Sequence, residues 1–324
     1  MKAFGWYPEN DGCAWYRIRQ PLELLGIPCS NTIPPEVALD GDSVIVAQRA
    51  YDPGPSQVLS FRAVNGWPTV YELDDLLWKI DPWNPSIKFF GNTEIKRILK
   101  HILNATLIFT STTDLADEVL NIKADAEIEV LPNFIPQSLL DLGVREGNDR
   151  AVIGYPASPS HGRDVLVMQA GLAKTLRRTN ASFLCIGTDF LKHLRVDGRA
   201  IPGTTDVQEF YTLLDFDILV APLTESRFNA CKSPIKVMEA AARGIPSVAT
   251  NFGPYAKYIE HGFDGFLCDN DKDWFTYLRL LVNDHDLRAE MGRNAREKVS
   301  ALTYEQNAFK WAEAIQSIAP PVLR

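Results

Sequence analysis

The sequence has only five cysteines, and their spacing suits neither a disulfide framework nor a zinc site. They are scattered at Cys13, Cys29, Cys185, Cys231 and Cys268, are odd in number and include no Cys-x-x-Cys pair. Disulfide-rich domains and structural zinc sites need paired or clustered cysteines. We therefore expect a reducing, cytoplasmic environment for this chain.

A long hydrophobic run and an excess of positive charge are also missing. No stretch approaches the roughly 18 apolar residues of a membrane-spanning helix, and the first residues, MKAFGWYPEND, become polar too soon for a secretory signal. The formal net charge is −8. Because proteins that bind duplex DNA use basic side chains to neutralise phosphates, nucleic acid is not the expected partner.

Strand and helix patterns alternate almost from end to end, which predicts an α/β fold. The 324 residues are enough for two domains of this class. Most apolar runs are continuous, as in strands covered on both faces, and this alternation is typical of parallel sheets. The expected strands are 3–7, 43–48, 69–73, 106–110 and 128–131, followed by 151–155, 182–186, 218–221, 247–250 and 265–268, and the clearest helices are 164–178, 207–214 and 234–243.

A polar stretch, Asp141–Asp149 (DLGVREGND), separates the two series of strands and is the best candidate for a linker. We expect an N-terminal domain over residues 1–145 and a C-terminal domain over 150–303. The tail, 304–324, is expected to contain a helix, Tyr304–Ile318, which ends before Pro320 and Pro321 and packs back on the N-terminal domain.

The segment 222–251 carries the strongest functional signal. A strand leads through a polar loop into a helix expected to begin at Ser233 and Pro234, because Ser is a common N-cap and Pro a common first helical residue. Lys232 then lies beside free backbone N–H groups that favour a phosphate. Glu239 can accept hydrogen bonds from a vicinal diol such as ribose. The alternative is that Lys232 and Glu239 are ordinary surface residues.

The end of this segment resembles retaining glycosyltransferases of family 4. Their motif Glu-Ala-x-Ala-x-Gly-x-Pro-x-Val-Ala-(Ser/Thr) is matched by EAAARGIPSVAT from Glu239 to Thr250, and RAEMGRNAREKV resembles their penultimate helix. The resemblance implies the GT-B fold, in which two Rossmann-like domains with parallel sheets face a cleft. It also implies transfer of a sugar from a nucleoside diphosphate sugar to an acceptor hydroxyl, with retention of configuration and without a metal or another cofactor.

One position departs from the family motif. The family commonly has a glutamate that contacts the donor sugar eight positions before Glu239, and Cys231 stands there. We interpret the local sequence as a variant in which Lys232, Ser233 and Lys236 replace the usual loop, while ribose recognition by Glu239 carries over. The donor-binding residues implied for the C-terminal domain are Ser158, Ser160, His161, Arg163, Gly187, Lys232, Ser233, Ile235, Lys236 and Glu239.

The loop in IGYPASPSHGRD, from Ile153 to Asp164, is the second candidate site. In the family this loop provides an arginine and a lysine that stabilise the leaving pyrophosphate. His161 stands about where the lysine would be, Arg163 is nearby, and the earlier arginine is missing. The positive charge is then expected from Arg163 and Lys232, with His161 as a candidate catalytic residue. The alternative is that His161 is solvated or caps a helix.

A strand end in the N-terminal half, TVYELDDLL, is expected near the reacting centre. The family often has His-Asp there, and Asp74 stands in its place as a candidate to orient or deprotonate the acceptor hydroxyl. Alternatively, Asp75 caps a short helix over Leu76–Ile80, or Glu72, Asp74 and Asp75 hold a divalent metal. The segment GCAWYRIRQP follows the first strand, where the family has a Gly-rich loop, so the resemblance implies that Gly12, Tyr16 and Arg17 lie on the acceptor or phosphate side.

An amphipathic basic helix is expected over residues 94–103, EIKRILKHIL. Its apolar stripe either packs on the sheet or, with the basic face that includes His101, docks on an anionic membrane surface.

The acceptor is expected to be a glycan, a lipid-linked saccharide or a small molecule. Two other functions remain open, namely glycosylation of DNA bases and a catalytically silent GT-B protein that binds a nucleotide or a partner.

Overall fold

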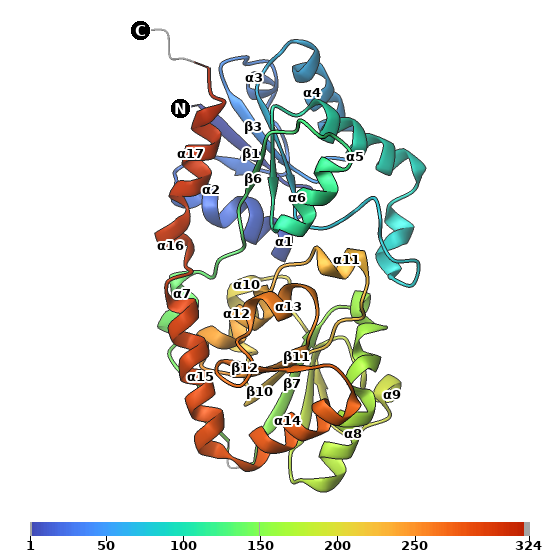
Figure 1. The fold of residues 1–324 in the computed structure, drawn as a ribbon. Helices are drawn as coiled ribbons and strands as arrows, with labels where there is room; N and C mark the ends of the chain where they lie inside the picture. The colour runs from blue at the N-terminus through green and yellow to red at the C-terminus, as the bar shows by residue number, and fades with distance from the viewer. Residues whose placement is uncertain (1, 149, 321–324) are drawn as a thin grey trace.

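The computed structural model describes residues 2–148 and 150–320, which form two α/β domains stacked one above the other (Figure 1). Each domain is built on a six-stranded sheet in which every pairing is parallel. The first sheet has the order β2-β1-β3-β4-β5-β6, with β1 (Ala3–Trp6), β2 (Cys29–Ser30), β3 (Val44–Gln48), β4 (Thr69–Leu73), β5 (Leu107–Thr110) and β6 (Ile128–Val130).

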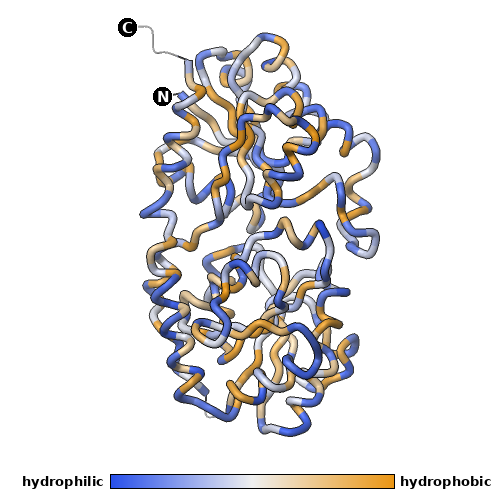
Figure 2. The backbone as a smooth tube through the Cα atoms, viewed as in Figure 1, coloured by the Kyte–Doolittle hydropathy of each residue, from blue (hydrophilic) through white to orange (hydrophobic). Residues whose placement is uncertain are grey.

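The second sheet has the order β12-β11-β10-β7-β8-β9. Its strands are β7 (Val152–Ala157), β8 (Ser182–Gly187), β9 (Arg199–Ile201), β10 (Ile218–Ala221), β11 (Ser247–Thr250) and β12 (Gly265–Cys268). The central strands are buried and apolar, and the chain is mostly hydrophobic where it crosses the middle of each domain (Figure 2). The expectation of two parallel α/β domains is therefore confirmed. The sequence missed β2 and β9, which lie at sheet edges and have no continuous apolar run.

Helices cover both sheets. The first domain has α1 (Gly12–Ala14), a π-helical turn (Trp15–Arg19), α2 (Gln20–Leu24), α3 (Pro35–Ala38), α4 (Pro53–Val64), a 3-10 helix (Pro85–Phe89), α5 (Asn92–Asn104) and α6 (Thr113–Leu120), and α7 (Gln137–Asp141) follows it. The second has 3-10 helices at Pro159–His161 and Asp164–Met168, then α8 (Gln169–Arg178), α9 (Leu191–Leu194), α10 (Val207–Thr212), α11 (Arg227–Ala230), α12 (Ile235–Ala242), α13 (Gly253–Tyr258), α14 (Asp271–Asn283) and α15 (His285–Ser300).

Three helix predictions within the two domains need correction. The helix expected over 164–178 is a 3-10 helix followed by α8. The helix expected from Ser233 begins at Ile235, with Pro234 in the N-cap position, although Ser233 Oγ still accepts a hydrogen bond from the Ile235 N–H at 3.4 Å. No helix forms over residues 76–80, so Asp75 does not act as a helix cap.

Helix α5 packs its apolar stripe inside the protein. Ile98 and Ile102 are fully buried in the core of the first domain. His101, predicted on the basic face, is instead buried beside Tyr71 and lies 2.7 Å from Ser56 Oγ. Leu103, at the end of the predicted stripe, is 52% exposed, so α5 leaves its basic edge and this one leucine for any contact with a membrane surface. None of the helices in the described ranges combines the length and apolarity that a bilayer span requires.

The C-terminal tail returns to the first domain after α15. The helix expected over 304–318 is divided into α16 (Tyr304–Asn307) and α17 (Phe309–Ser317). Helix α16 packs against α2, and α17 continues along the first domain in Figure 1. Tyr304 donates a hydrogen bond to the backbone oxygen of Tyr16, and Trp311 is fully buried against Phe134. Asp149 and Pro321, which the predicted linker and helix end included, lie outside the described residues, as do residues 322–324.

Candidate functional site

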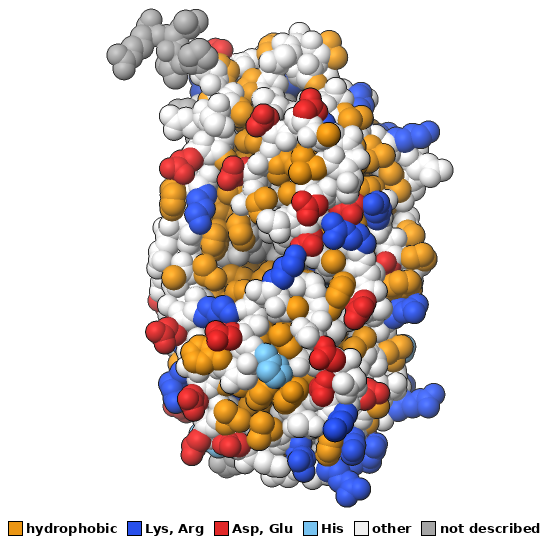
Figure 3. Space-filling model, viewed as in Figure 1, with side chains coloured by type: hydrophobic (Ala, Val, Ile, Leu, Met, Phe, Trp, Pro, Cys, Tyr) orange, Lys and Arg blue, Asp and Glu red, His pale blue; other side chains and the backbone are white. Residues whose placement is uncertain are grey.

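Two cavities meet at the carboxyl ends of the strands, which is where open parallel sheets place their ligands. The first, in the second domain, has a volume of about 280 Å³, and we name it the nucleotide cavity because it is lined by several residues that the resemblance implies for donor binding. The interdomain cavity, of about 320 Å³, lies between the two domains. His161 and Lys236 line both of them. On the face shown in Figure 3 the molecule is hollowed between its two halves.

The nucleotide cavity is built around the ends of β7 and β8. Ser158 follows β7, Gly187 ends β8, and Phe210 comes from α10. Gly187 has φ +93°, and a Cβ atom at this position would lie 2.8 Å from the Ala157 carbonyl oxygen. The backbone of two neighbouring strands therefore approaches closely at the cavity wall, and only glycine permits this approach.

Gly187→Ala is expected to destabilise the chain by about 1–3 kcal/mol, because alanine is strained at positive φ and its Cβ meets a backbone oxygen. Thermal unfolding measures this loss. The matched control is Gly162→Ala, since Gly162 has φ −60° and its added Cβ meets nothing closer than 3.6 Å. Equal melting temperatures for the two variants would contradict the prediction.

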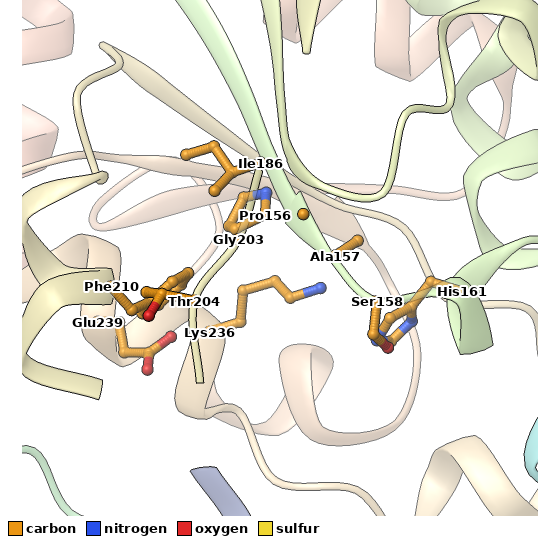
Figure 4. Close-up of a pocket in the computed structure, with 11 residues that line it drawn as sticks. Pro156, Ala157, Ser158, His161, Ile186, Gly203, Thr204, Phe210, Lys236 and Glu239 are labelled. Carbon is orange, nitrogen blue, oxygen red and sulfur yellow. The ribbon is translucent and has the colours of Figure 1, made fainter. Parts of the chain in front are cut away.

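Lys236 crosses the nucleotide cavity. In Figure 4 its side chain starts near Glu239 and Phe210, and its amine points toward Ser158 and His161. Burial lowers the pKa of Lys236 to about 8, although Asp164 and Glu239 act in the opposite direction. The amine is therefore a cation near neutral pH, and a negatively charged ligand would stabilise its buried charge.

Glu239 forms a bond between the two domains. Its carboxylate accepts a hydrogen bond from the hydroxyl of Tyr16, which in turn lies 2.7 Å from the hydroxyl of Tyr211. Burial raises the pKa of Glu239 to about 7, against the lowering effects of Tyr16 and Lys236. Glu239, the residue predicted to bind ribose, thus lines the nucleotide cavity. Tyr16, predicted on the acceptor side, reaches Glu239 from the first domain.

The N-terminal wall of the interdomain cavity carries a network of ion pairs. Asp74, at the end of β4, accepts hydrogen bonds from Arg49 Nε and Nη2 on its two carboxylate oxygens. Burial raises the pKa of Asp74, but Arg49 outweighs this effect and the net pKa lies below its ordinary value. Asp75 lies 3.2 Å from Arg49 Nη2 and 3.3 Å from Lys232 Nζ of the other domain. Arg49 gives no signal in the sequence, and its φ of +48° is rare for a residue other than glycine.

Arg17 lies at the buried end of this wall and is only 1% exposed. Its Nε donates to Glu72 at 2.6 Å, and its Nη1 donates to Asn133 Oδ1 at 2.8 Å. Gly12 and Tyr16 line the same cavity, as do Ser233 and Ile235, which enter from the second domain. Of the predicted acceptor-side loop, Arg19 turns away and pairs with Glu23 instead.

Three positions singled out from the sequence lie apart from both cavities. Arg163, expected to bind the diphosphate, stacks on Trp83 of the first domain with 4.2 Å between its guanidinium carbon and the ring centroid. Ser160 lines neither cavity, although its hydroxyl lies 2.7 Å from that of Ser158. Cys231 is fully buried in a core cluster, so it does not take over the sugar contact of the missing glutamate.

The predicted metal alternative finds no support in the carboxylates themselves. Glu72 pairs with Arg17, and Asp74 pairs with Arg49. Within residues 2–148 and 150–320, no group of three or more His, Cys, Asp or Glu side chains is placed to hold a metal ion.

Comparison with known proteins finds similarity to glycosyltransferases, with the family match in the second domain. The family model described as "Glycosyl transferases group 1" matches residues 200–298. The chain is 28% identical over 196 residues to a D-inositol 3-phosphate glycosyltransferase of Arthrobacter sp. and covers 44% of it. It is 26% identical over 226 residues to the N-acetyl-alpha-D-glucosaminyl L-malate synthase of Bacillus anthracis and covers 56% of it. These matches involve 55% and 63% of this chain. Because they cover 44% and 56% of the relatives, the chain spans about half the length of these curated proteins.

Solved structures resemble the whole chain. Anabaena HepE, whose structures include complexes with UDP and with UDP-glucose, aligns with a TM-score of 0.69 and 16% identity over 98% of this chain and 100% of its own. TarM aligns with a TM-score of 0.62 and 18% identity over 85% of this chain and 55% of its own. The likeness shows that the architecture is the GT-B fold, as the sequence predicted.

Proposed function

Because the chain has the GT-B fold and its second domain matches the family model of group 1 glycosyl transferases, we propose that it transfers a sugar from a nucleoside diphosphate sugar to an acceptor hydroxyl. The observation that carries this proposal is the pair of cavities joined at His161 and Lys236. One cavity has the size and lining for a nucleoside, and the other is bordered by both domains. A donor that spans the junction places its diphosphate beside fixed positive charge.

The nucleoside is assigned to the second domain. The Glu239 carboxylate lies on the wall of that cavity and can accept hydrogen bonds from the two ribose hydroxyls, once it shares or gives up its bond to Tyr16. Phe210 offers an aromatic face for the base. Of the solved relatives, HepE binds UDP, and this makes uridine the first base to test here.

The diphosphate is assigned to the junction. Negative charge grows on the β-phosphate as its bond to the sugar breaks, so fixed cations lower the barrier most effectively at this point. Lys236 lies there, and Lys232 lines the adjoining cavity. Lys236 therefore takes the part that the sequence analysis gave to Arg163, which is engaged with Trp83.

The sugar and the acceptor are assigned to the interdomain cavity, between the junction and the wall that carries Asp74 and Asp75. Retention of configuration is supported by the resemblance to family 4 and requires the acceptor hydroxyl to approach the face that the phosphate leaves. Asp74 can orient that hydroxyl through a carboxylate that Arg49 keeps ionised.

A panel of UDP-, GDP-, ADP- and dTDP-sugars tests the proposal. A cognate donor at about 100 times its Kd is expected to stabilise the chain by about 2.7 kcal/mol, which thermal unfolding detects. That donor should also be hydrolysed slowly when no acceptor is present, and transfer should persist in EDTA. Binding without any hydrolysis or transfer would favour the catalytically silent alternative, whereas no binding across the panel would contradict the proposal.

A further inference from the structure

His161, at the junction of the two cavities, is held by a carboxylate whose oxygens all have partners. Asp164 Oδ2 lies 2.8 Å from His161 Nδ1. Asp164 Oδ1 accepts from the Thr224 N–H and from Asn229 Nδ2, both at 2.9 Å. Burial raises the pKa of Asp164, but the interaction with His161 and the hydrogen bond from Thr224 outweigh that effect and hold the pKa below its ordinary value. Because an ionised carboxylate only accepts, the ring hydrogen of a neutral His161 lies on Nδ1, which leaves a lone pair on Nε2.

The charges that face His161 come from three other segments. Lys236 lies on α12, Lys232 precedes that helix, and Asp164 begins the 3-10 helix before α8. The Glu239 carboxylate lines the same cavity. Burial, followed by the charge of Lys236, lowers the pKa of His161 to about 4 despite its bond to Asp164. In the ligand-free site the imidazole is therefore neutral at physiological pH.

We propose that His161 takes up a proton on Nε2 when the donor diphosphate binds, so that the Asp164–His161 pair becomes a charged hydrogen-bond donor to a phosphate oxygen. This inference rests on the proposed function. A lone pair repels a phosphate oxygen, whereas an imidazolium attracts it, and a carboxylate on Nδ1 stabilises an imidazolium, as it does in Ser-His-Asp triads. Burial, with the charges of Lys236 and Lys232, keeps His161 deprotonated in the ligand-free site, and the negative charge of the diphosphate offsets the effect of the two lysines.

The proton balance of the transfer follows from this arrangement. The bond between the sugar C1 and the β-phosphate oxygen breaks, and the bond between C1 and the acceptor oxygen forms. The hydroxyl proton of the acceptor passes to the departing phosphate oxygen. The proton on His161 comes from solvent when the donor binds and returns to solvent when the nucleoside diphosphate leaves. His161 thus stabilises the leaving group without being consumed.

Titration calorimetry with UDP-glucose at pH 6, in buffers of different protonation enthalpy, measures the protons taken up. UDP-glucose has no group of its own that titrates near this pH, so any uptake belongs to the protein. The wild type is expected to take up as much as one proton, and its affinity should fall by up to about tenfold per unit as pH rises from 5 toward the pKa of the bound state. His161→Gln should bind more weakly and without this uptake.

Two controls separate His161 from its neighbours. His193 lies 2.8 Å from the Gly162 carbonyl through its Nε2 and lines neither cavity, so His193→Gln should behave like the wild type. Glu239, with its raised pKa, also titrates near neutrality, and the difference between the wild type and His161→Gln removes its contribution. Equal proton uptake by the wild type and by His161→Gln would overturn the proposal.

Nitrogen chemical shifts of the histidine rings give an independent readout. In the ligand-free protein, the signal that disappears in His161→Gln should be that of a neutral ring protonated on Nδ1, and it should shift to that of an imidazolium when UDP-glucose is added at pH 6. A ring protonated on Nε2 in the free protein, or no shift on binding, would refute the proposal. Failure of every nucleotide sugar to bind would instead refute the proposed function.

Discussion

Lys236→Met is expected to lower kcat for sugar transfer by about 10²- to 10³-fold, the loss that follows removal of one preorganised group that stabilises developing charge. The lysine amine points toward Ser158 and His161 across the nucleotide cavity, and burial keeps its pKa near 8 until an anion arrives (Figure 4). Methionine retains the length and packing of the side chain but removes the charge. The fold should therefore be kept, which thermal unfolding checks.

A matched control is Lys257→Met. Lys257 is 60% exposed, pairs with Asp114 across the domain boundary and lines neither cavity, so its loss should leave kcat nearly unchanged. Lys232→Met should have an intermediate effect, because Asp75 already pairs with this lysine. A Lys236→Met protein with at least half of the wild-type kcat would show that the charge at the junction comes from another residue.

Glu239→Ala is expected to weaken nucleotide binding by about 1–3 kcal/mol, or roughly 5- to 150-fold, because the ribose hydroxyls lose their buried acceptor. Calorimetry with UDP and with its 2′-deoxy and 3′-deoxy analogues tests the assignment sharply. The wild type should prefer UDP over at least one analogue, and Glu239→Ala should bind UDP and that analogue alike. Unchanged discrimination in the variant would place the ribose elsewhere.

The bond between Glu239 and Tyr16 requires a second variant. Glu239→Ala also removes the acceptor of an interdomain hydrogen bond, so a loss of affinity can arise from altered packing of the domains. Tyr16→Phe breaks the same bond and leaves the carboxylate in place. If the ribose assignment is right, Tyr16→Phe retains the preference for UDP over the deoxy analogue. Loss of that preference in both variants would indicate that domain packing controls binding.

The central strands were predictable because each is a short continuous apolar run, and residues such as Val46 and Val220 are fully buried in parallel sheets. The edge strands were not predicted because they have no continuous apolar run. Strand β9, Arg199–Ile201, pairs on only one side and includes exposed residues. The helix over 76–80, an alternative in which Asp75 was the cap, does not form. In the structure that carboxylate pairs with Arg49 and Lys232, contacts that a local sequence pattern does not record.

The candidate site was predictable where it depends on local sequence and not where it depends on contacts between domains. Lys232, Lys236 and Glu239 belong to one loop and helix, and all three line a cavity. The bond between Tyr16 and Glu239 joins positions 223 residues apart, and only the folded chain reveals it. Arg49 gave no signal because an arginine after a strand is ordinary in sequence. Its importance follows from its backbone conformation and from the two aspartates it holds.

The return of the chain to the first domain affects the order in which the protein can fold during synthesis. Nascent proteins generally fold domain by domain, beginning with the N-terminal one. Here Trp311 of α17 packs against Phe134 and the buried Arg17. The first domain therefore lacks this covering helix until the ribosome has made the entire second domain. The apolar surface that α17 later covers stays open throughout that interval, and it is the surface that a chaperone would be expected to bind.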